Sequence, residues 1–153
     1  MWDMVSDPRG HADHGHHDAV HARADRRVVR DRLGPAGPDR LAITANGSDE
    51  YLGEIVLNDI DEVVGSANLR LVMRPAYRGG RGYGTEAIEL VLGLAFDGIG
   101  LHRVGLDVLS INARAYSLYE NIGFRVEGRL RDAYRDGDGW CDAILMALLE
   151  DEY

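Results

Sequence analysis

The sequence predicts a mixed α/β fold, built as a single domain over residues 1–153. Short runs of alternating apolar and polar residues, typical of strands, flank two runs that are typical of helices. A glycine-rich loop joins the third predicted strand to the first helix. Another strand follows that helix, and this order indicates a parallel βαβ crossover. We therefore expect an α+β fold in which an antiparallel meander leads into a crossover and a C-terminal hairpin ends the chain.

The first 39 residues form an atypical leader, and residues 40–153 form the predicted core. Apolar residues are few in the leader, so we expect it to be poorly ordered or loosely packed, because little burial offsets the entropy of ordering. One helix is predicted in it, from Asp18 to Leu33. Five histidines lie between positions 11 and 21. No cysteine accompanies them and glycines and aspartates surround them, so a metal site is not the favoured interpretation.

The predicted meander has three strands, at Leu41–Ala45, at Tyr51–Asn58, and from Glu62 or Val63 to Met73. Asn46 and Gly47 are typical of a hairpin turn between the first two strands. Gly53 is a candidate bulge, because a glycine inside a strand often marks one. A second turn is predicted at Asn58–Asp61.

The second half of the chain alternates helices and strands. The predicted elements are a helix from Thr85 to about Asp97, a strand at Arg103–Leu109, a helix from Asn112 to the residue before Gly123, and strands at Phe124–Leu130 and Cys141–Leu149. Gly98 and Gly100 are expected to end the first helix, and Asn112 to cap the second. The first helix is apolar on most sides, which predicts that it is largely buried.

The loop from Arg78 to Gly84 contains four glycines and two arginines. Glycine has no Cβ atom, so the backbone can turn tightly and bring its N–H groups close to a ligand. The following helix adds unpaired N–H donors and the positive end of its dipole. A phosphate or pyrophosphate fits such a site, and Arg78 and Arg81 add forked donors for its oxygens. The alternative is a surface turn with solubilising arginines.

Three kinds of phosphate-binding loop compete for this pattern. A Walker A loop requires a lysine, and the chain contains none. The dinucleotide pattern G-x-G-x-x-G/A occurs at Gly82, Gly84 and Ala87, but it is weak alone. The acidic residue that it needs about 20 positions later, at a strand end, is not found, because Asp107 lies inside a predicted strand. The third kind is the pyrophosphate loop of acyl-CoA-dependent acetyltransferases.

The glycine loop resembles motif A of the GNAT superfamily, Q/R-x-x-G-x-G/A, with Gly82 and Gly84 at its glycines. The Q/R position falls on Gly79, and the arginine stands one place earlier, at Arg78. The segment Asn112–Phe124 is similar to the GNAT pattern N-x-x-A-x-x-x-Y-x-x-x-G-F at every key position. The resemblance is closest to the branch that holds ribosomal-protein-alanine acetyltransferases (the RimJ/RimL type) and spermidine acetyltransferases. Domains of this family normally begin with a strand, and this first strand is expected to be missing here.

The resemblance implies an N-acetyltransferase that moves an acetyl group from acetyl-CoA, its co-substrate, to a primary amine by direct attack in a ternary complex. It implies no metal. The acceptor is a protein N-terminus, a polyamine or another small amine. The implied CoA-binding residues are Leu71, Val72, Met73, Arg78, Gly79, Gly80, Arg81, Gly82, Tyr83, Gly84, Thr85 and Asn112.

Tyr119 is the general acid that the resemblance implies. A phenol with a pKa of about 10 is protonated at pH 7 and can donate to a leaving thiolate. Asn112 lies two helical turns earlier on the same face. Tyr116 is the alternative acid.

The general base stays open among four carboxylates of the central strands and turns, Glu54, Asp59, Glu62 and Asp107, and a water chain to any of them would also serve. In the predicted final hairpin, Asp142 is interpreted as structural. Trp140 is interpreted as a wall of the amine site.

Charge and composition limit the classes of binding partner that we expect for this chain. The net charge is −9, and residues 41–153 hold 10 arginines and 19 acidic residues, which argues against nucleic acid and mildly favours cationic amines. No apolar run reaches the roughly 18 residues of a membrane span and no signal-peptide pattern occurs, so we expect no membrane partner and a cytoplasmic protein. A homodimer is an open possibility. Two other functions also stay open: a CoA-binding module without catalysis, and a dinucleotide-binding domain.

Overall fold

The computed structural model describes residues 26–31, 39–45, 47, 50–78 and 81–153, with side chains from residue 40 onward. The histidine-rich stretch lies outside the described residues, as do the start of the helix predicted from Asp18 and two residues of the glycine loop, Gly79 and Gly80. Most of the leader that was predicted to be loose, residues 1–25 and 32–38, therefore lies outside the described residues.

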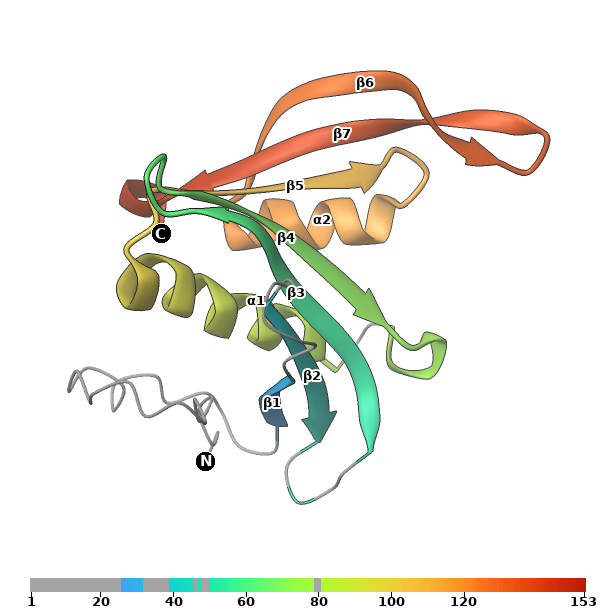
Figure 1. The fold of residues 1–153 in the computed structure, drawn as a ribbon. Helices are drawn as coiled ribbons and strands as arrows, with labels where there is room; N and C mark the ends of the chain where they lie inside the picture. Colours follow the sequence, from blue (N-terminus) through green and yellow to red (C-terminus); the bar gives the residue numbers. More distant parts are fainter. Residues whose placement is uncertain (1–25, 32–38, 46, 48–49, 79–80) are drawn as a thin grey trace. The chain divides into compact units, whose positions relative to one another are not determined.

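The described residues form seven strands and two α-helices (Figure 1). In chain order these are β1 (Arg26–Asp31), β2 (Asp39–Ala45), β3 (Tyr51–Asp61), β4 (Ser66–Met73), α1 (Tyr83–Gly93), β5 (Arg103–Leu109), α2 (Ala113–Ile122), β6 (Arg125–Asp136) and β7 (Gly139–Leu149). The strands follow the order β1-β2-β3-β4-β5-β7-β6 in one sheet, in which β4 and β5 are parallel. The predicted mixed sheet, with its meander, its crossover and its C-terminal hairpin, is confirmed.

β1 corrects two expectations about the leader. A helix was expected to reach Leu33 and an N-terminal strand was expected to be missing, whereas Arg26–Asp31 is a strand that pairs antiparallel with β2 along its whole length. Val28 and Val29 lie at its centre, and β-branched residues favour a strand. The edge of β2 supplies backbone hydrogen-bond partners for this segment, and no local pattern reveals such a partner.

The turn between β3 and β4 is also corrected. It was expected at Asn58–Asp61, but β3 continues to Asp61 and the turn occupies the next four residues. Asp61 Oδ1 accepts hydrogen bonds from the N–H groups of Val63 and Val64, both at 2.9 Å. Gly65 then closes the turn with a φ of 74°. The side chain of Asp61 therefore decides where the chain reverses, because an aspartate can cap a turn two residues ahead.

By its internal contacts, the chain divides into two compact units, each made of two segments. The first comprises Met1–Asn58 and Arg70–Val91, and the second comprises Asp59–Leu69 and Leu92–Tyr153. A single domain over the whole chain stays a prediction.

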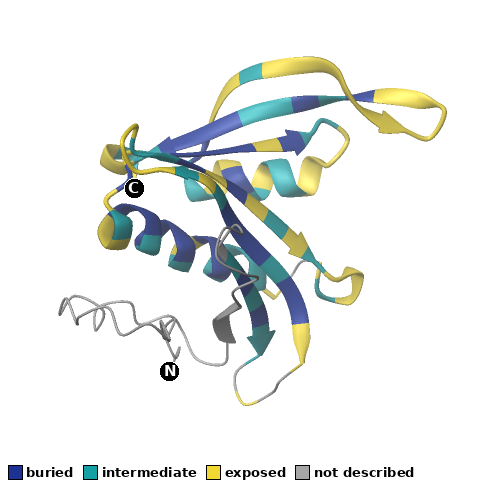
Figure 2. Cartoon of the chain, viewed as in Figure 1, coloured by how far each residue is buried: buried dark blue, intermediate teal, exposed yellow. Residues whose placement is uncertain are grey.

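In the first unit, β2 and β3 pair antiparallel. Together with α1 they bury a group of apolar side chains (Figure 2). The register shifts beside Gly53: Ile43 faces Gly53, whereas Thr44 faces Tyr51. The bulge therefore lies beside Gly53, where the sequence predicted it. The buried apolar residues of this unit are Leu41, Ile43, Leu52, Ile55, Val56, Leu57, Ala87, Ile88 and Val91.

In the second unit, Ser66–Asn68 of β4 pairs in parallel with Arg103–Gly105 of β5. β7 lies between β5 and β6 and pairs antiparallel with both. β6 and β7 run further than predicted and meet in a turn at Gly137 and Asp138. The largest buried side chains of this unit are Leu69, Leu92, Phe96, Leu101, Val104, Leu106, Val108, Tyr119, Phe124, Met146 and Leu148.

The first predicted helix is observed in two parts. After α1, the chain continues as a π-helical turn over Leu94–Ile99. Gly100 ends this turn with a φ of 82°, as predicted, and its N–H donates to the Ala95 carbonyl. Gly98, which was also expected to end the helix, lies inside the turn. No helix in the described part of the chain is long and apolar enough to cross a membrane.

Candidate functional site

The glycine loop leads into α1 within the first unit. α1 begins at Tyr83, two residues earlier than predicted. Gly82 precedes it with a φ of 70°, and the first helical bond runs from the Glu86 N–H to the Gly82 carbonyl at 3.1 Å. Tyr83, Gly84 and Thr85 therefore lie in the first turn, whose N–H groups have no partner within a helix. This geometry suits an anion.

Two arginines, Arg78 and Arg81, belong to the described part of the loop. Arg78 Nε donates to the Met73 carbonyl at 3.0 Å and so ties the start of the loop to the end of β4. The Arg81 guanidinium lies over the Tyr77 ring, 6.0 Å from its centre, and Tyr77 packs edge-on against Tyr83. Of the two predicted phosphate-binding arginines, Arg81 thus lies near the N-terminus of α1, whereas Arg78 is held at the end of β4.

The last residues of β4, which include Leu71, Val72 and Met73, are the ones predicted to bind the thioester arm of acetyl-CoA. Its parallel pairing with β5 covers Ser66–Asn68 and stops there, so Leu71, Val72 and Met73 lie beyond the paired residues. The Val72 side chain is exposed, and those of Leu71 and Met73 are half-buried. Strand residues beyond the end of a ladder can keep backbone groups for a ligand.

α2 carries the second motif and belongs to the second unit. Asn112 Oδ1 accepts a hydrogen bond from the Ala115 N–H at 3.1 Å, so the predicted N-cap is confirmed. Gly123 ends the helix with a φ of 122°. The Phe124 N–H then donates to the Tyr119 carbonyl at 3.0 Å. These contacts define both ends of the helix that carries Tyr119.

Tyr119 is the buried tyrosine of α2, with 6% of its surface exposed. Its ring packs edge-on against Phe124, with ring centres 5.8 Å apart. Burial, and then the negative charge of Asp107, raise the pKa of Tyr119 to about 12. No hydrogen bond joins its hydroxyl to another described residue. Tyr119 therefore stays protonated at neutral pH with an O–H that can donate to a ligand.

Glu54 lies on β3 in the first unit and was one of the candidate bases. Its carboxylate lies 3.6 Å from Arg40 and 3.7 Å from Arg70. The Tyr51 hydroxyl also donates to it at 3.4 Å. Glu54 therefore bridges two strands through ion pairs.

The other three candidate bases belong to the second unit. Asp59 Oδ2 accepts from the Asn68 amide at 3.4 Å, and Glu62 is exposed in the turn. Asp107 Oδ2 accepts from the Tyr134 hydroxyl at 2.8 Å. Asp107 also acts electrostatically on Tyr119.

Asp142 and Trp140 of β7 have distinct surroundings. Asp142 accepts hydrogen bonds from the Asp132 N–H at 2.8 Å and from Arg129 Nε at 2.5 Å. These contacts, the Asp132 backbone first, lower the pKa of Asp142. Trp140 is exposed and lies under the Arg135 guanidinium, 4.8 Å from the ring centre. Asp142 thus holds a bulge of β6 in place, consistent with a structural role.

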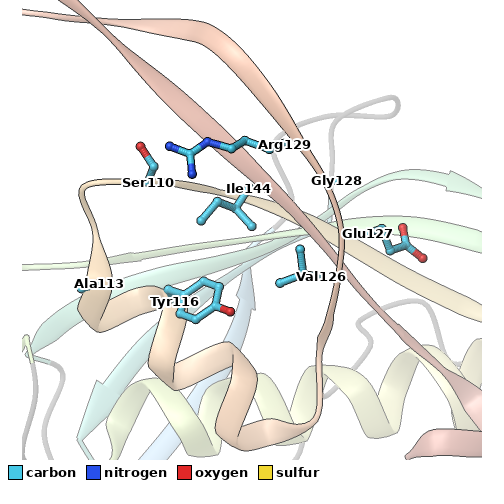
Figure 3. A pocket seen from close by; sticks show the side chains of 8 residues that line it. All are labelled: Ser110, Ala113, Tyr116, Val126, Glu127, Gly128, Arg129 and Ile144. Atoms are coloured by element: carbon cyan, nitrogen blue, oxygen red, sulfur yellow. The ribbon is translucent and has the colours of Figure 1, made fainter.

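A pocket of about 560 Å³ opens beside α2, entirely within the second unit (Figure 3). Its lining residues are Ser110, Ala113, Tyr116, Val126, Glu127, Gly128, Arg129 and Ile144. The Tyr116 side chain points into it, toward Val126 and Ile144 (Figure 3). The residues from β6 and β7 were not foreseen from the sequence, because only the folded hairpin brings them to α2. Tyr116 and Tyr119 therefore have different surroundings, one beside an open pocket and the other in the core.

No group of three or more His, Cys, Asp or Glu in the described residues is arranged to hold a metal ion.

Known proteins resemble this chain in sequence and in fold. The spermidine N(1)-acetyltransferase of Escherichia coli K12 is 28% identical over 114 residues, which cover 74% of this chain and 60% of that protein. The chain thus spans about three fifths of that relative. An uncharacterized N-acetyltransferase, p20, of Bacillus licheniformis is 26% identical over 89% of this chain and 76% of its own length.

A spermidine N-acetyltransferase from Vibrio cholerae, solved in complex with CoA and spermine, superposes with a TM-score of 0.71 at 26% identity, over 76% of this chain and 68% of that chain. Another structure of the V. cholerae enzyme is dodecameric. Residues 2–125 match the family model described as the acetyltransferase (GNAT) domain. Since this match spans most of the sequence and the solved relative has the same fold, the chain belongs to the GNAT acetyltransferase family.

Proposed function

We propose that this chain is an N-acetyltransferase that transfers the acetyl group of acetyl-CoA to a primary amine by direct attack in a ternary complex. The observation that carries the proposal is Tyr119. Its hydroxyl is protonated at neutral pH, has no hydrogen-bond partner among the described residues, and stands on the helix that carries the family's second motif. Membership of the GNAT family supports the same chemistry.

In this proposal, acetyl-CoA binds along the β4–α1 segment. The pyrophosphate lies on the first-turn N–H groups of Tyr83, Gly84 and Thr85, beside Arg78, Gly79, Gly80, Arg81 and Gly82. The helix N-terminus and the two guanidiniums offset the negative charge of the phosphates. The backbone of Leu71, Val72 and Met73 meets the thioester arm, and Asn112 adds a contact from α2.

The proposed reaction is a single displacement. The neutral amine nitrogen attacks the thioester carbonyl carbon, and the C–S bond breaks as the new C–N bond forms. The leaving sulfur takes the hydroxyl proton of Tyr119, and the ammonium formed on the acceptor loses a proton to a base or to water. A phenol with a pKa of about 12 is a weaker acid than a thiol of ~8.5, so complete transfer of its proton to the thiolate is uphill. Tyr119 therefore stabilises the charge that develops on sulfur by donating its hydrogen bond, and a tyrosinate formed by transfer regains a proton from the acceptor ammonium. This route needs no metal.

The acceptor is proposed as a class: a protein N-terminus, a polyamine or another small amine. Relatives named as spermidine acetyltransferases and the acidic charge of this chain support a cationic amine. We further propose that residues 1–153 work as one acetyltransferase domain, with the acetyl-CoA site in residues 40–153. A homodimer or a larger assembly is also proposed, and the dodecameric structure of the V. cholerae enzyme supports self-association.

A thiol-release assay tests the proposal. The full chain is incubated with acetyl-CoA and a panel of amines, and free CoA thiol is measured. We expect amine-dependent release, and acetylated amine in equal amount by mass spectrometry. CoA binding without release for any amine would favour a CoA-binding module, and tighter binding of NAD than of CoA would favour a dinucleotide-binding domain.

A further inference from the structure

Tyr77 joins three parts of the first unit at the start of the glycine loop. It is the last residue of a short 3₁₀ turn, Pro75–Tyr77, that follows β4. Its hydroxyl donates to Oε1 of Glu50, which directly precedes β3. Its ring packs edge-on against that of Tyr83, the first residue of α1, with ring centres 6.2 Å apart. The Tyr77 ring is therefore held both at its hydroxyl and at its edge.

The face of the Tyr77 ring carries the Arg81 guanidinium, whose central carbon lies 6.0 Å from the ring centre. A cation over an aromatic face is attracted by the negative charge of that face. Arg81 is exposed, and an exposed arginine side chain has many rotamers, which it loses when it binds a ligand. The ring restricts these rotamers before the ligand arrives, so less entropy is lost on binding.

Arg81 also stands next to the proposed phosphate site. Only Gly82 separates it from α1, whose first turn offers the N–H groups that are proposed to bind the pyrophosphate. Guanidinium donors form a planar fork that matches two phosphate oxygens. A guanidinium that lies over a ring can still use this fork, because the donors point outward in its own plane. The position of Arg81 thus suits a charged contact with the same phosphates.

Arg78 is engaged elsewhere, although it belongs to the same loop. Its Nε donates to the Met73 carbonyl at 3.0 Å, and its backbone N–H donates to the Pro75 carbonyl at 3.3 Å. These bonds tie Arg78 to the end of β4 and to the turn that follows. Because Nε is used on a carbonyl, only the Nη end of this guanidinium is left for a second contact. The two loop arginines therefore have different surroundings and different tasks.

We propose that Tyr77 is a positioning residue of the acetyl-CoA site and that the arginine it holds, Arg81, makes the direct charged contact with the CoA phosphates. Arg78 ties the start of the loop to β4 and acts on the phosphates only through its charge at a distance. This inference rests on the proposed acetyl-CoA site and names the side chains that bind and orient there.

CoA binding without an acceptor amine tests the inference. CoA and acetyl-pantetheine, which lacks the phosphates, are titrated into the full chain by calorimetry. Arg81→Gln should weaken CoA binding by about tenfold, the effect of losing one charge-assisted contact, and should leave acetyl-pantetheine binding unchanged. Arg78→Gln should weaken CoA binding much less. The matched control is Arg70→Gln, which removes an exposed charge paired with Glu54 and should change the affinity by less than about twofold.

Three variants at position 77 test the positioning role. Tyr77→Leu should weaken CoA binding by about threefold, the size of an exposed cation–π contact. Tyr77→Phe keeps the ring and loses only the bond to Glu50, so it should retain most of the affinity. In the double variant, Tyr77→Leu added to Arg81→Gln should cause no further loss, because Tyr77 acts through Arg81. Wild-type affinity for acetyl-pantetheine shows that each variant is folded.

Several results would overturn the inference. One is wild-type CoA affinity in Arg81→Gln, and another is a loss in Arg78→Gln that equals the loss in Arg81→Gln. Fully additive losses in the double variant would show that Tyr77 supports the fold and does not act through Arg81. A wild-type chain that does not bind CoA would also overturn it.

Kinetics then separate this inference from the proposed function. In the thiol-release assay, Arg81→Gln and Tyr77→Leu should raise KM for acetyl-CoA with kcat unchanged, because the phosphate contact is the same in the ground state and in the transition state. If the wild type releases thiol and both variants keep its KM, the inference fails and the function stands. If no amine drives release but CoA binding changes as described above, the function fails and the roles of Arg81 and Tyr77 stand.

Discussion

Gly53 of β3 lies so close to Val72 of β4 that a Cβ atom at Gly53 would stand 2.4 Å from the Val72 carbonyl oxygen. Val72 belongs to the segment proposed to meet the thioester arm of acetyl-CoA. The bulge beside Gly53 therefore does more than bend β3, because it lets β4 approach at the point where the ligand is expected.

Gly53→Ala should lower the free energy of unfolding by about 1–3 kcal/mol, as for other overpacked sites. It should also weaken CoA binding, because β4 must move away. Gly139→Ala is the control, since its Cβ would meet its nearest atom at an ordinary 3.6 Å. Denaturant titration and CoA calorimetry measure both effects. Equal stability of the two variants would show that β4 yields without cost.

Gly82→Val should abolish CoA binding while leaving the sheet intact. The φ of 70° at Gly82 is one that L side chains rarely adopt. The added branches would also stand where the pyrophosphate approaches. Binding of acetyl-pantetheine, which lacks the pyrophosphate, should change much less. Calorimetry with both ligands measures this, and normal CoA affinity in the variant would remove the loop from the site.

Tyr119→Phe should reduce kcat by about 10²–10⁴-fold, the usual range for loss of a general acid. The ring is kept, so its packing on Phe124 and the CoA affinity should survive. Tyr116→Phe, on the same helix but facing the open pocket, is the matched control and should act much less. The measurement is steady-state thiol release where chemistry limits the rate, and an unchanged kcat there would return Tyr119 to the core.

The pKa of Tyr119 also predicts a pH dependence of stability. Its value is about 12 in the folded chain against 10.0 for a free phenol. Below pH 10 the folded and the unfolded chain both keep the Tyr119 proton, so the free energy of unfolding loses nothing through the titration of this residue. Between pH 10 and 12 only the unfolded state loses the proton, so stability falls as pH rises, by up to about 3 kcal/mol. Denaturant titrations of wild type and Tyr119→Phe should diverge only in this window.

Asn112 has a structural and a proposed binding role, and two variants separate them. Asn112→Ala removes the cap of α2 and should cost about 1 kcal/mol of stability. Asn112→Asp keeps a capping oxygen, so stability should be retained. If Asn112 also contacts CoA through its amide N–H₂, both variants should weaken CoA binding. Wild-type CoA affinity in Asn112→Asp would limit this residue to the cap.

Much of the fold was predictable because its signals are local. The start of α2 follows from the Asn112 side chain, which reaches an N–H three residues away. The end of the first helical segment follows from Gly100, which adopts a φ that favours glycine. The bounds of β5 follow from one run of strand-forming residues. Such elements depend on near neighbours, and the residues of the two motifs lie within them.

Only the tertiary structure decided the rest. β1 forms where the local pattern favoured a helix, because the edge of β2 provides its hydrogen bonds. The burial that raises the pKa of Tyr119 comes from packing in the second unit. The Tyr134–Asp107 pair joins residues 27 positions apart across an intervening strand. Contacts at such separations depend on how the strands order in the sheet, and no spacing within either segment encodes that order.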